Sequence, residues 1–219
     1  MTHIPALLTL AHQHAHPLSV SFALSLAAGF HQLCREGHTA QEAAETAIRL
    51  TTDQGFPHWR AFSALLRAWA LAHLGQAQEG IEQINQSLSA YRATEAELWR
   101  PYLLALLAEA HGTIREPEEG LTLLTEALTL VDTTGQRWYE AELYRLRGEL
   151  LLQQNAGNQA EAETCFQQAI SIARSQQAKS FELRTATSLA RLWQQQGKRQ
   201  EAYDLLAPVY GWFTEGFDT

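Results

Sequence analysis

Hydrophobic residues between Trp99 and Asp132 recur at intervals of three and four. They form one apolar stripe over Leu103–Ala110 and a second over Leu121–Val131. This spacing places the apolar side chains on one face of a helix. Pro117 lies between the stripes, among acidic residues. Proline fits the first turn of a helix because its missing N–H is not needed there, and acidic residues favour the positive helix N-terminus. The pattern predicts two amphipathic helices joined by a tight turn.

The same pattern returns about every 40 residues. Small residues share one place in the first helix of each unit: Ala28, Ala68, Ala108 and Gly148. A second small position falls in the second helix: Ala40, Gly80 and Gly120. The turn between the helices reads Arg35, Gly75, Arg115 and Asn155, after which the insertion Ala156-Gly157 shifts the frame by two. Small residues allow helices to approach closely, and one helix pair cannot bury both its faces, so the pairs must stack.

These patterns predict an all-α protein with a single domain over residues 1–219. Its architecture is a right-handed superhelical solenoid of about five antiparallel helix pairs. The predicted pairs span 17–53, 57–93, 97–132, 137–176 and 180–214, after a half unit at 3–15. Pro101 falls in a first helical turn, whereas Pro208 falls inside the last helix and is expected to kink or end it.

The last unit reads Ala186-x-x-Leu189-Ala190-x-x-Trp193-x-x-x-Gly197-x-x-x-x-Ala202. This pattern resembles the tetratricopeptide repeat (TPR). The period of 40 is longer than the usual 34, so the helices are longer. Other segments resemble the C-terminal region of bacterial regulators that join a nucleotide cyclase or winged-helix domain to a signal-transduction ATPase: RPYLLALLAEAHG, WYEAELYRLRGELLL, EAETCFQQAISIAR and GWFTEGFDT. The resemblance implies a regulatory or partner-binding module of such a regulator, not its catalytic part.

The charge of the chain narrows the choice of partner. It has 16 Lys and Arg against 24 Asp and Glu, a net charge of -8, with no basic run. We therefore expect neither nucleic acid nor a membrane surface as partner. No stretch approaches the roughly 20 apolar residues of a membrane span, and the N-terminus lacks the pattern of a signal peptide. Cys34 and Cys165 lie far apart, which suggests a reducing cytoplasm and predicts two small core residues.

The sequence contains no catalytic motif that would suggest an enzyme or a cofactor. A phosphate-binding glycine loop, HExxH, G-x-S-x-G and zinc-spaced cysteines are all missing. His31 and His111 share a repeat position, which favours a role in repeat packing. A transition-metal site stays open, as the alternative to a solvated helix end, for four histidines: His3, His12, His14 and His16.

The first helices of stacked pairs line a concave face, which repeat arrays use for binding. The resemblance places eight candidate residues on this face: Phe62, Trp69, Tyr102, Glu109, Arg145, Glu149, Arg184 and Arg191. Glu142 belongs to the same face. Because aromatics and arginines anchor many interfaces, we predict a groove for a peptide or protein segment. Its apolar end would lie near Trp69, and an acidic group or C-terminus near Arg184 and Arg191.

Other interpretations of these residues and of the chain remain open. Phe62 and Trp69 could instead be interhelix core, with the Arg and Glu side chains pairing on a solvated face. The function could be that of a small-molecule sensor, which a closed apolar pocket would favour over an open channel. It could also be self-association as a homodimer, because terminal repeats need a polar cap to stay separate.

Overall fold

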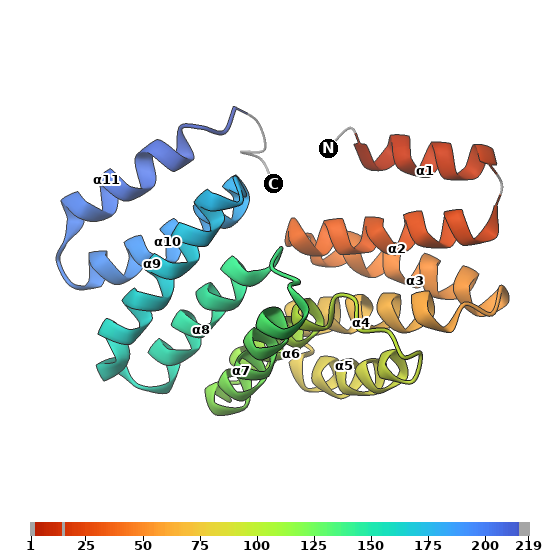
Figure 1. The fold of residues 1–219 in the computed structure, drawn as a ribbon, viewed down its shortest axis with the longest axis horizontal. Coiled ribbons are helices and arrows are strands. Elements are labelled where there is room, and N and C mark those ends of the chain that lie inside the picture. The colour runs from red at the N-terminus through yellow and green to blue at the C-terminus, as the bar shows by residue number, and fades with distance from the viewer. Residues whose placement is uncertain (1–2, 15, 215–219) are drawn as a thin grey trace. The chain divides into compact units, whose positions relative to one another are not determined.

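The computed structural model describes residues 3–14 and 16–214, which form helices joined by turns and loops, with no strand in these ranges (Figure 1). Its helices are α1 (His3–His14), α2 (Pro17–Leu33), α3 (Gly37–Asp53), α4 (Pro57–His73), α5 (Ala77–Arg92), α6 (Arg100–Thr113), α7 (Pro117–Thr134), α8 (Glu140–Gln154), the 3₁₀ helix η1 (Ala156–Asn158), α9 (Gln159–Ser175), α10 (Lys179–Gln195) and α11 (Arg199–Tyr210). The prediction of an all-α helical solenoid is confirmed. The last five residues of the GWFTEGFDT segment lie outside the described residues.

The chain divides into two compact units, Met1–Leu98 and Trp99–Thr219. The first contains α1 to α5, and the second contains α6 to α11 with η1. Within each unit, helices that follow one another in sequence pack together, as α2 does with α3 and α8 with α9 (Figure 1). First helices of successive pairs also touch, α2 with α4, α6 with α8 and α8 with α10. A single domain over residues 1–219 stays a prediction.

Small residues lie where the two helices of a pair cross. A Cβ atom added to Gly80 of α5 would lie 2.8 Å from the Ala68 carbonyl oxygen of α4. One added to Gly120 of α7 would lie 3.0 Å from the Ala108 carbonyl oxygen of α6. The two small-residue positions of the repeat therefore face each other, and the predicted close approach of the helices is confirmed.

The predicted turn position has left-handed backbone. Arg35, Gly75 and Arg115 have φ values of 66°, 98° and 62°, and Gly197 in the last pair has φ 81°. A left-handed residue ends a helix by directing the next N–H groups back to its last carbonyls. Asn155 differs, with φ −155°, because the inserted residues form η1 and its side chain accepts a hydrogen bond from the Gly157 N–H.

A second left-handed position follows the second helix of each of the first four pairs. It consists of Gly55, Glu95, Gly135 and Gln177, with φ values of 70°, 58°, 74° and 55°. Their spacing is the repeat period, lengthened at the last step by the two-residue insertion. Both turns of the repeat therefore end the preceding helix with a left-handed residue, whether or not that residue is glycine.

Replacing Gln177 by glycine should raise the free energy of unfolding by about 0.5–1 kcal/mol, since a non-glycine residue pays a steric cost in this conformation. Gln168 provides the matched control: it is exposed in the right-handed interior of α9, where glycine should lower stability by about 1 kcal/mol. Urea unfolding followed by circular dichroism measures both. Loss of stability in both variants would contradict the role given to the left-handed turn.

Two helices begin later than predicted. The sequence predicts starts at 97 and 137, whereas α6 begins at Arg100 and α8 at Glu140. Trp99 has φ 70°, and its N–H donates to the Gln136 Oε1 at 2.7 Å. This hydrogen bond joins the loop before α6 to the loop before α8 and holds both loops out of helical geometry. The last helix, α11, contains Pro208 and ends at Tyr210, four residues before the predicted end at 214. That the proline kinks or ends this helix stays a prediction.

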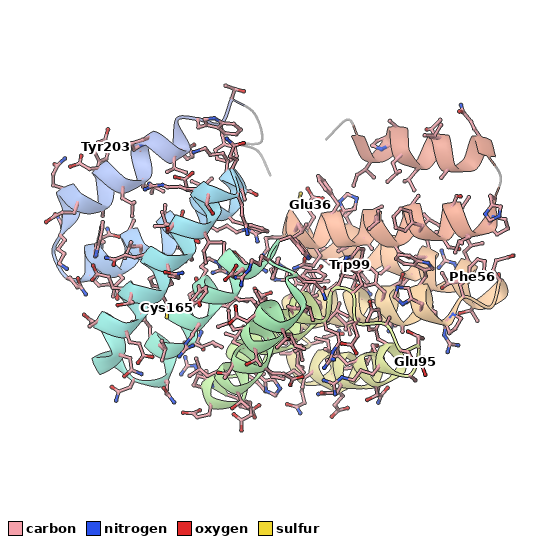
Figure 2. The ribbon with its side chains drawn as sticks, in the orientation of Figure 1. Glu36, Phe56, Glu95, Trp99, Cys165 and Tyr203 are labelled. Carbon is pink, nitrogen blue, oxygen red and sulfur yellow. The ribbon has the colours of Figure 1, made fainter. Side chains whose placement is uncertain are left out.

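The two cysteines differ in environment. Cys165 of α9 is buried, as predicted, and lies among the side chains that fill the space between the helices (Figure 2). The prediction of a buried Cys34 is wrong. Cys34 is the C-cap residue of α2 and is exposed, because the helix ends there and the chain turns.

Candidate functional site

The two candidate residues of the first unit lie in its core. Phe62 and Trp69, both on α4, are each 1% exposed. The Trp69 ring stacks on the His73 ring at a centroid distance of 4.8 Å, and the Arg35 guanidinium lies 5.5 Å from the Trp69 ring centroid. These side chains serve the packing of their own unit. Their predicted role in binding stays a prediction.

An aromatic cluster opens the first helices of the second unit. Tyr102 packs against Trp138 and Tyr139 at centroid distances of 5.2 and 4.9 Å, and Tyr139 packs against Phe181 at 5.5 Å. Tyr102 and Tyr139 are 3% and 2% exposed. Burial, followed by nearby carboxylates such as Glu109, raises the pKa of both hydroxyls. Tyr102 is therefore a neutral core residue, and its predicted role in binding stays a prediction.

Beside these aromatics, α8 and α10 are joined by a network that we call the charged cluster. It contains Glu142, Arg145, Glu149, Arg184 and Ser188. Arg145 donates to Glu142 at 2.7 Å and forms an ion pair with Glu149 at 2.6 Å. Arg184 of α10 donates to Glu142 at 3.1 Å, and Ser188 donates to Glu149 at 2.8 Å. The structure thus brings together three of the predicted residues: Arg145, Glu149 and Arg184.

The centre of the charged cluster, Glu142 and Arg145, is buried, whereas the side chains of Glu149 and Arg184 are 36% and 22% exposed. Arg145 is 7% exposed and Glu142 is 1% exposed. Burial alone would lower the pKa of Arg145, but the carboxylates of Glu142 and Glu149 outweigh it and raise that pKa. Glu142 Oε2 and Arg145 Nε are buried without a hydrogen-bond partner. Because buried polar atoms are normally bonded, the cluster has hydrogen-bonding capacity left for water or a ligand group.

Two pockets adjoin the charged cluster. The first pocket, of about 180 Å³ between α6 and α8, is lined by Glu109, Gly112, Thr113, Leu146, Glu149, Leu150 and Gln153. The second pocket, of about 220 Å³, is lined by Glu149, Leu152, Gln153, Phe166, Ser188, Arg191, Leu192 and Gln195. Glu149 and Gln153 line both. The predicted residues Glu109 and Arg191 therefore lie on either side of Glu149.

Gln153 and Ser188 belong to this site but were not predicted from the sequence. Gln153 follows Glu149 by four residues, and Ser188 follows Arg184 by four. Side chains at this spacing are neighbours on a helix surface. Extending the predicted face of α8 by one turn would have found Gln153, and widening the predicted face of α10 between Arg184 and Arg191 would have found Ser188.

The predictions for the histidines concern two groups: the pair that shares a repeat position, and the histidines near the N-terminus. His31 Nδ1 contacts Glu36 at 2.6 Å and His111 Nδ1 contacts Glu116 at 2.9 Å, the same contact in two repeats. This confirms the interpretation as repeat packing. The side chains of His3, His12 and His14 lie outside the described residues, so the metal-site alternative stays a prediction. Among the side chains that the structure does describe, no three potential ligands lie close enough to hold a metal ion.

Comparison with known proteins identifies the fold. No protein-family model and no curated protein matches the chain. The apo form of RapI matches with a TM-score of 0.69 and 14% identity, over 90% of this chain and 70% of that chain. BtubC (BKLC) from P. vanneervenii matches with a TM-score of 0.64 and 16% identity, over 95% and 87%. A putative kinesin light chain of TPR-like repeats from Podosopora anserina matches with a TM-score of 0.58 and 21% identity, over 86% and 92%.

The chain has a TPR-like fold. This confirms one part of the resemblance seen in the sequence, whereas the context of a nucleotide cyclase or ATPase regulator stays a prediction. Identities this low establish the fold alone, so the function has to be argued from the site. None of the helices in the described ranges is long and apolar enough to cross a membrane.

Proposed function

We propose that this TPR-like chain is a non-catalytic protein-interaction module. Its partner segment binds on the second unit, along the face formed by α6, α8 and α10. The observation that carries the proposal is the row of two adjoining pockets beside the charged cluster. TPR-like arrays generally bind partners through the face of their first helices, and these pockets supply that face with specific polar groups.

The lining and openness of the two pockets favour a chain segment over a small molecule, which usually binds in a closed, mostly apolar cavity. Both pockets are open, and polar side chains line a large part of each. Gly112, Thr113 and Gln153 of the first pocket also line a further open pocket of about 590 Å³, so the surface continues beyond it. An extended segment can place successive side chains in the two pockets, on either side of Glu149 and Gln153.

Arg191 supplies the contact for an acidic group of the partner. It is exposed and lines the second pocket with Gln153 and Gln195. Arg184, the other arginine expected in this role, is engaged with Glu142. A carboxylate at Arg191 would form a charge-assisted hydrogen bond, which is stronger than a neutral one. The resemblance to C-terminal regions of bacterial regulators supports a place for this module in a cytoplasmic signalling protein.

A phage-displayed library of random dodecapeptides, selected on the immobilised chain, tests the proposal. We expect enrichment of specific peptides whose affinity falls at least about tenfold in the Arg191→Glu variant. Arg199→Glu is the matched control, because Arg199 is exposed on α11 and lines neither pocket. Failure to enrich any peptide, or equal binding by the Arg191→Glu variant, would contradict the proposal.

Self-association is the second candidate function, and one observation favours it. α11 carries the exposed side chain of Tyr203 (Figure 2). Tyr203 is 67% exposed, Tyr210 at the end of the same helix is 54% exposed, and Trp212 just beyond it is 59% exposed. Aromatic side chains are enriched in protein–protein interfaces. Light scattering coupled to size exclusion, over a tenfold concentration range, measures the mass. A dimer that the Tyr203→Glu/Tyr210→Glu variant loses would support this candidate, whereas a monomer throughout would exclude it.

A further inference from the structure

The first pocket combines an apolar wall with two carboxylates. Leu146 and Leu150 of α8 form part of its lining, together with Glu109 of α6 and Glu149 of α8. Lysine and arginine bury their alkyl stems along apolar surface while the charged head stays near polar groups. A pocket of about 180 Å³ with this lining has the chemistry to hold one such side chain.

The charges around the pocket also favour a cation. Three carboxylates, from Glu109, Glu142 and Glu149, lie near two guanidinium groups, from Arg145 and Arg184. Glu142 is 1% exposed and its charge is compensated by the two arginines, with which it pairs at 2.7 and 3.1 Å. Glu109 and Glu149 are the two carboxylates that line the pocket itself. A cation that enters the pocket would be attracted to both, since charges withdrawn from solvent are stable when paired.

The net charge of the whole chain also favours a basic partner segment. A chain with a net charge of -8 attracts positively charged segments as they approach it. An acidic side chain entering the first pocket would instead meet Glu109 and Glu149, which is repulsive.

We propose that the partner segment places a lysine or arginine side chain in the first pocket, between Glu109 and Glu149. With an acidic group at Arg191 in the second pocket, this contact fixes the direction in which the segment crosses α6, α8 and α10. The inference rests on the proposed function and specifies the partner that this face selects.

The peptides selected on the wild-type chain provide the probe. We expect a basic residue at one conserved position of the enriched sequences. The most enriched peptide is synthesised with a fluorescent label, and its affinity is measured by anisotropy. Exchanging that basic residue for glutamate should weaken binding at least about tenfold, and Glu109→Lys should weaken binding of the original peptide to a similar degree.

The charge-swapped pair gives the sharpest outcome. The glutamate peptide should bind the Glu109→Lys variant within about threefold of the wild-type affinity, since the ion pair is restored with its polarity reversed. Glu119→Lys makes the same charge change on an exposed site of α7 and should leave binding unchanged. The milder Glu109→Gln variant, checked by circular dichroism, covers the case in which Glu109→Lys does not fold.

The outcomes separate the two proposals. Enriched peptides without a basic position, or peptides that lose binding in Arg191→Glu but keep it in both Glu109 variants, would overturn the basic-residue inference and leave the interaction face intact. Failure to enrich any peptide would overturn the proposed function, and the inference with it.

Discussion

Replacing Gly80 by alanine should lower the free energy of unfolding of the first unit by about 1–3 kcal/mol, although alanine favours helices. The added Cβ would lie 2.7 Å from the Ala72 Cβ and 2.8 Å from both the Ala68 carbonyl oxygen and the Ala72 nitrogen. Two of these three atoms are backbone, so relief requires α4 and α5 to move apart. Urea unfolding followed by circular dichroism measures the loss.

Gly29 gives this prediction a control of opposite sign. It lies inside α2, and a Cβ added there would meet only the Leu66 Cδ1, at an ordinary 3.8 Å. Gly29→Ala should therefore raise stability by about 0.5–1 kcal/mol through helix propensity alone. Equal effects of the two substitutions would show that α4 and α5 lie farther apart at Gly80 than in this structure.

Removing one member of the buried ion pair should have the largest effect in the second unit. Glu142→Leu leaves the 7%-exposed Arg145 with Glu149 as its remaining partner. Breaking a buried pair in this way costs about 3–5 kcal/mol, because a charge stays buried with too little compensation. The double variant Glu142→Leu/Arg145→Met should regain most of that loss, since apolar side chains of similar volume often replace a buried pair without penalty.

Denaturant unfolding of the wild type, both single variants and the double variant completes a thermodynamic cycle. Arg137→Met serves as the exposed comparison. Arg137 pairs with Asp132 and Glu140, and its side chain is 52% exposed. Its loss should cost far less than breaking the buried pair, because solvent screens exposed ion pairs. A double variant no more stable than Glu142→Leu would show that the cluster stabilises the unit beyond charge compensation.

The sequence was sufficient to predict the helices and the repeat. Apolar spacing and recurring small residues place most helix ends within about three residues of those observed. The second left-handed position was missed, because Glu95 and Gln177 occupy it without being glycine. The late starts of α6 and α8 depend on the Trp99–Gln136 hydrogen bond, which joins residues 37 apart and has no local signature.

The site was harder to predict than the fold. The resemblance to TPR proteins placed Arg145, Glu149 and Arg184 on one face, but it could not show which charges pair, because i+3 and i+4 partners compete with partners on α10. Trp69 is of a residue type that often anchors interfaces, and its place in the repeat predicts that it lines the groove. It is buried because Arg35, from a turn, and His73, from the end of its own helix, lie close to its ring.

The one-sided packing of α11 means that stability varies along the second unit. Among its residues only Ala202 and Val209 are buried, whereas α10 buries seven. A helix held by one neighbour opens locally at a lower free-energy cost than one held between two. Backbone amides of α11 should therefore exchange with deuterium well before those of α10. A partner that binds α11 would be detected as selective slowing of that exchange, which distinguishes it from a ligand of the pockets beside Glu149.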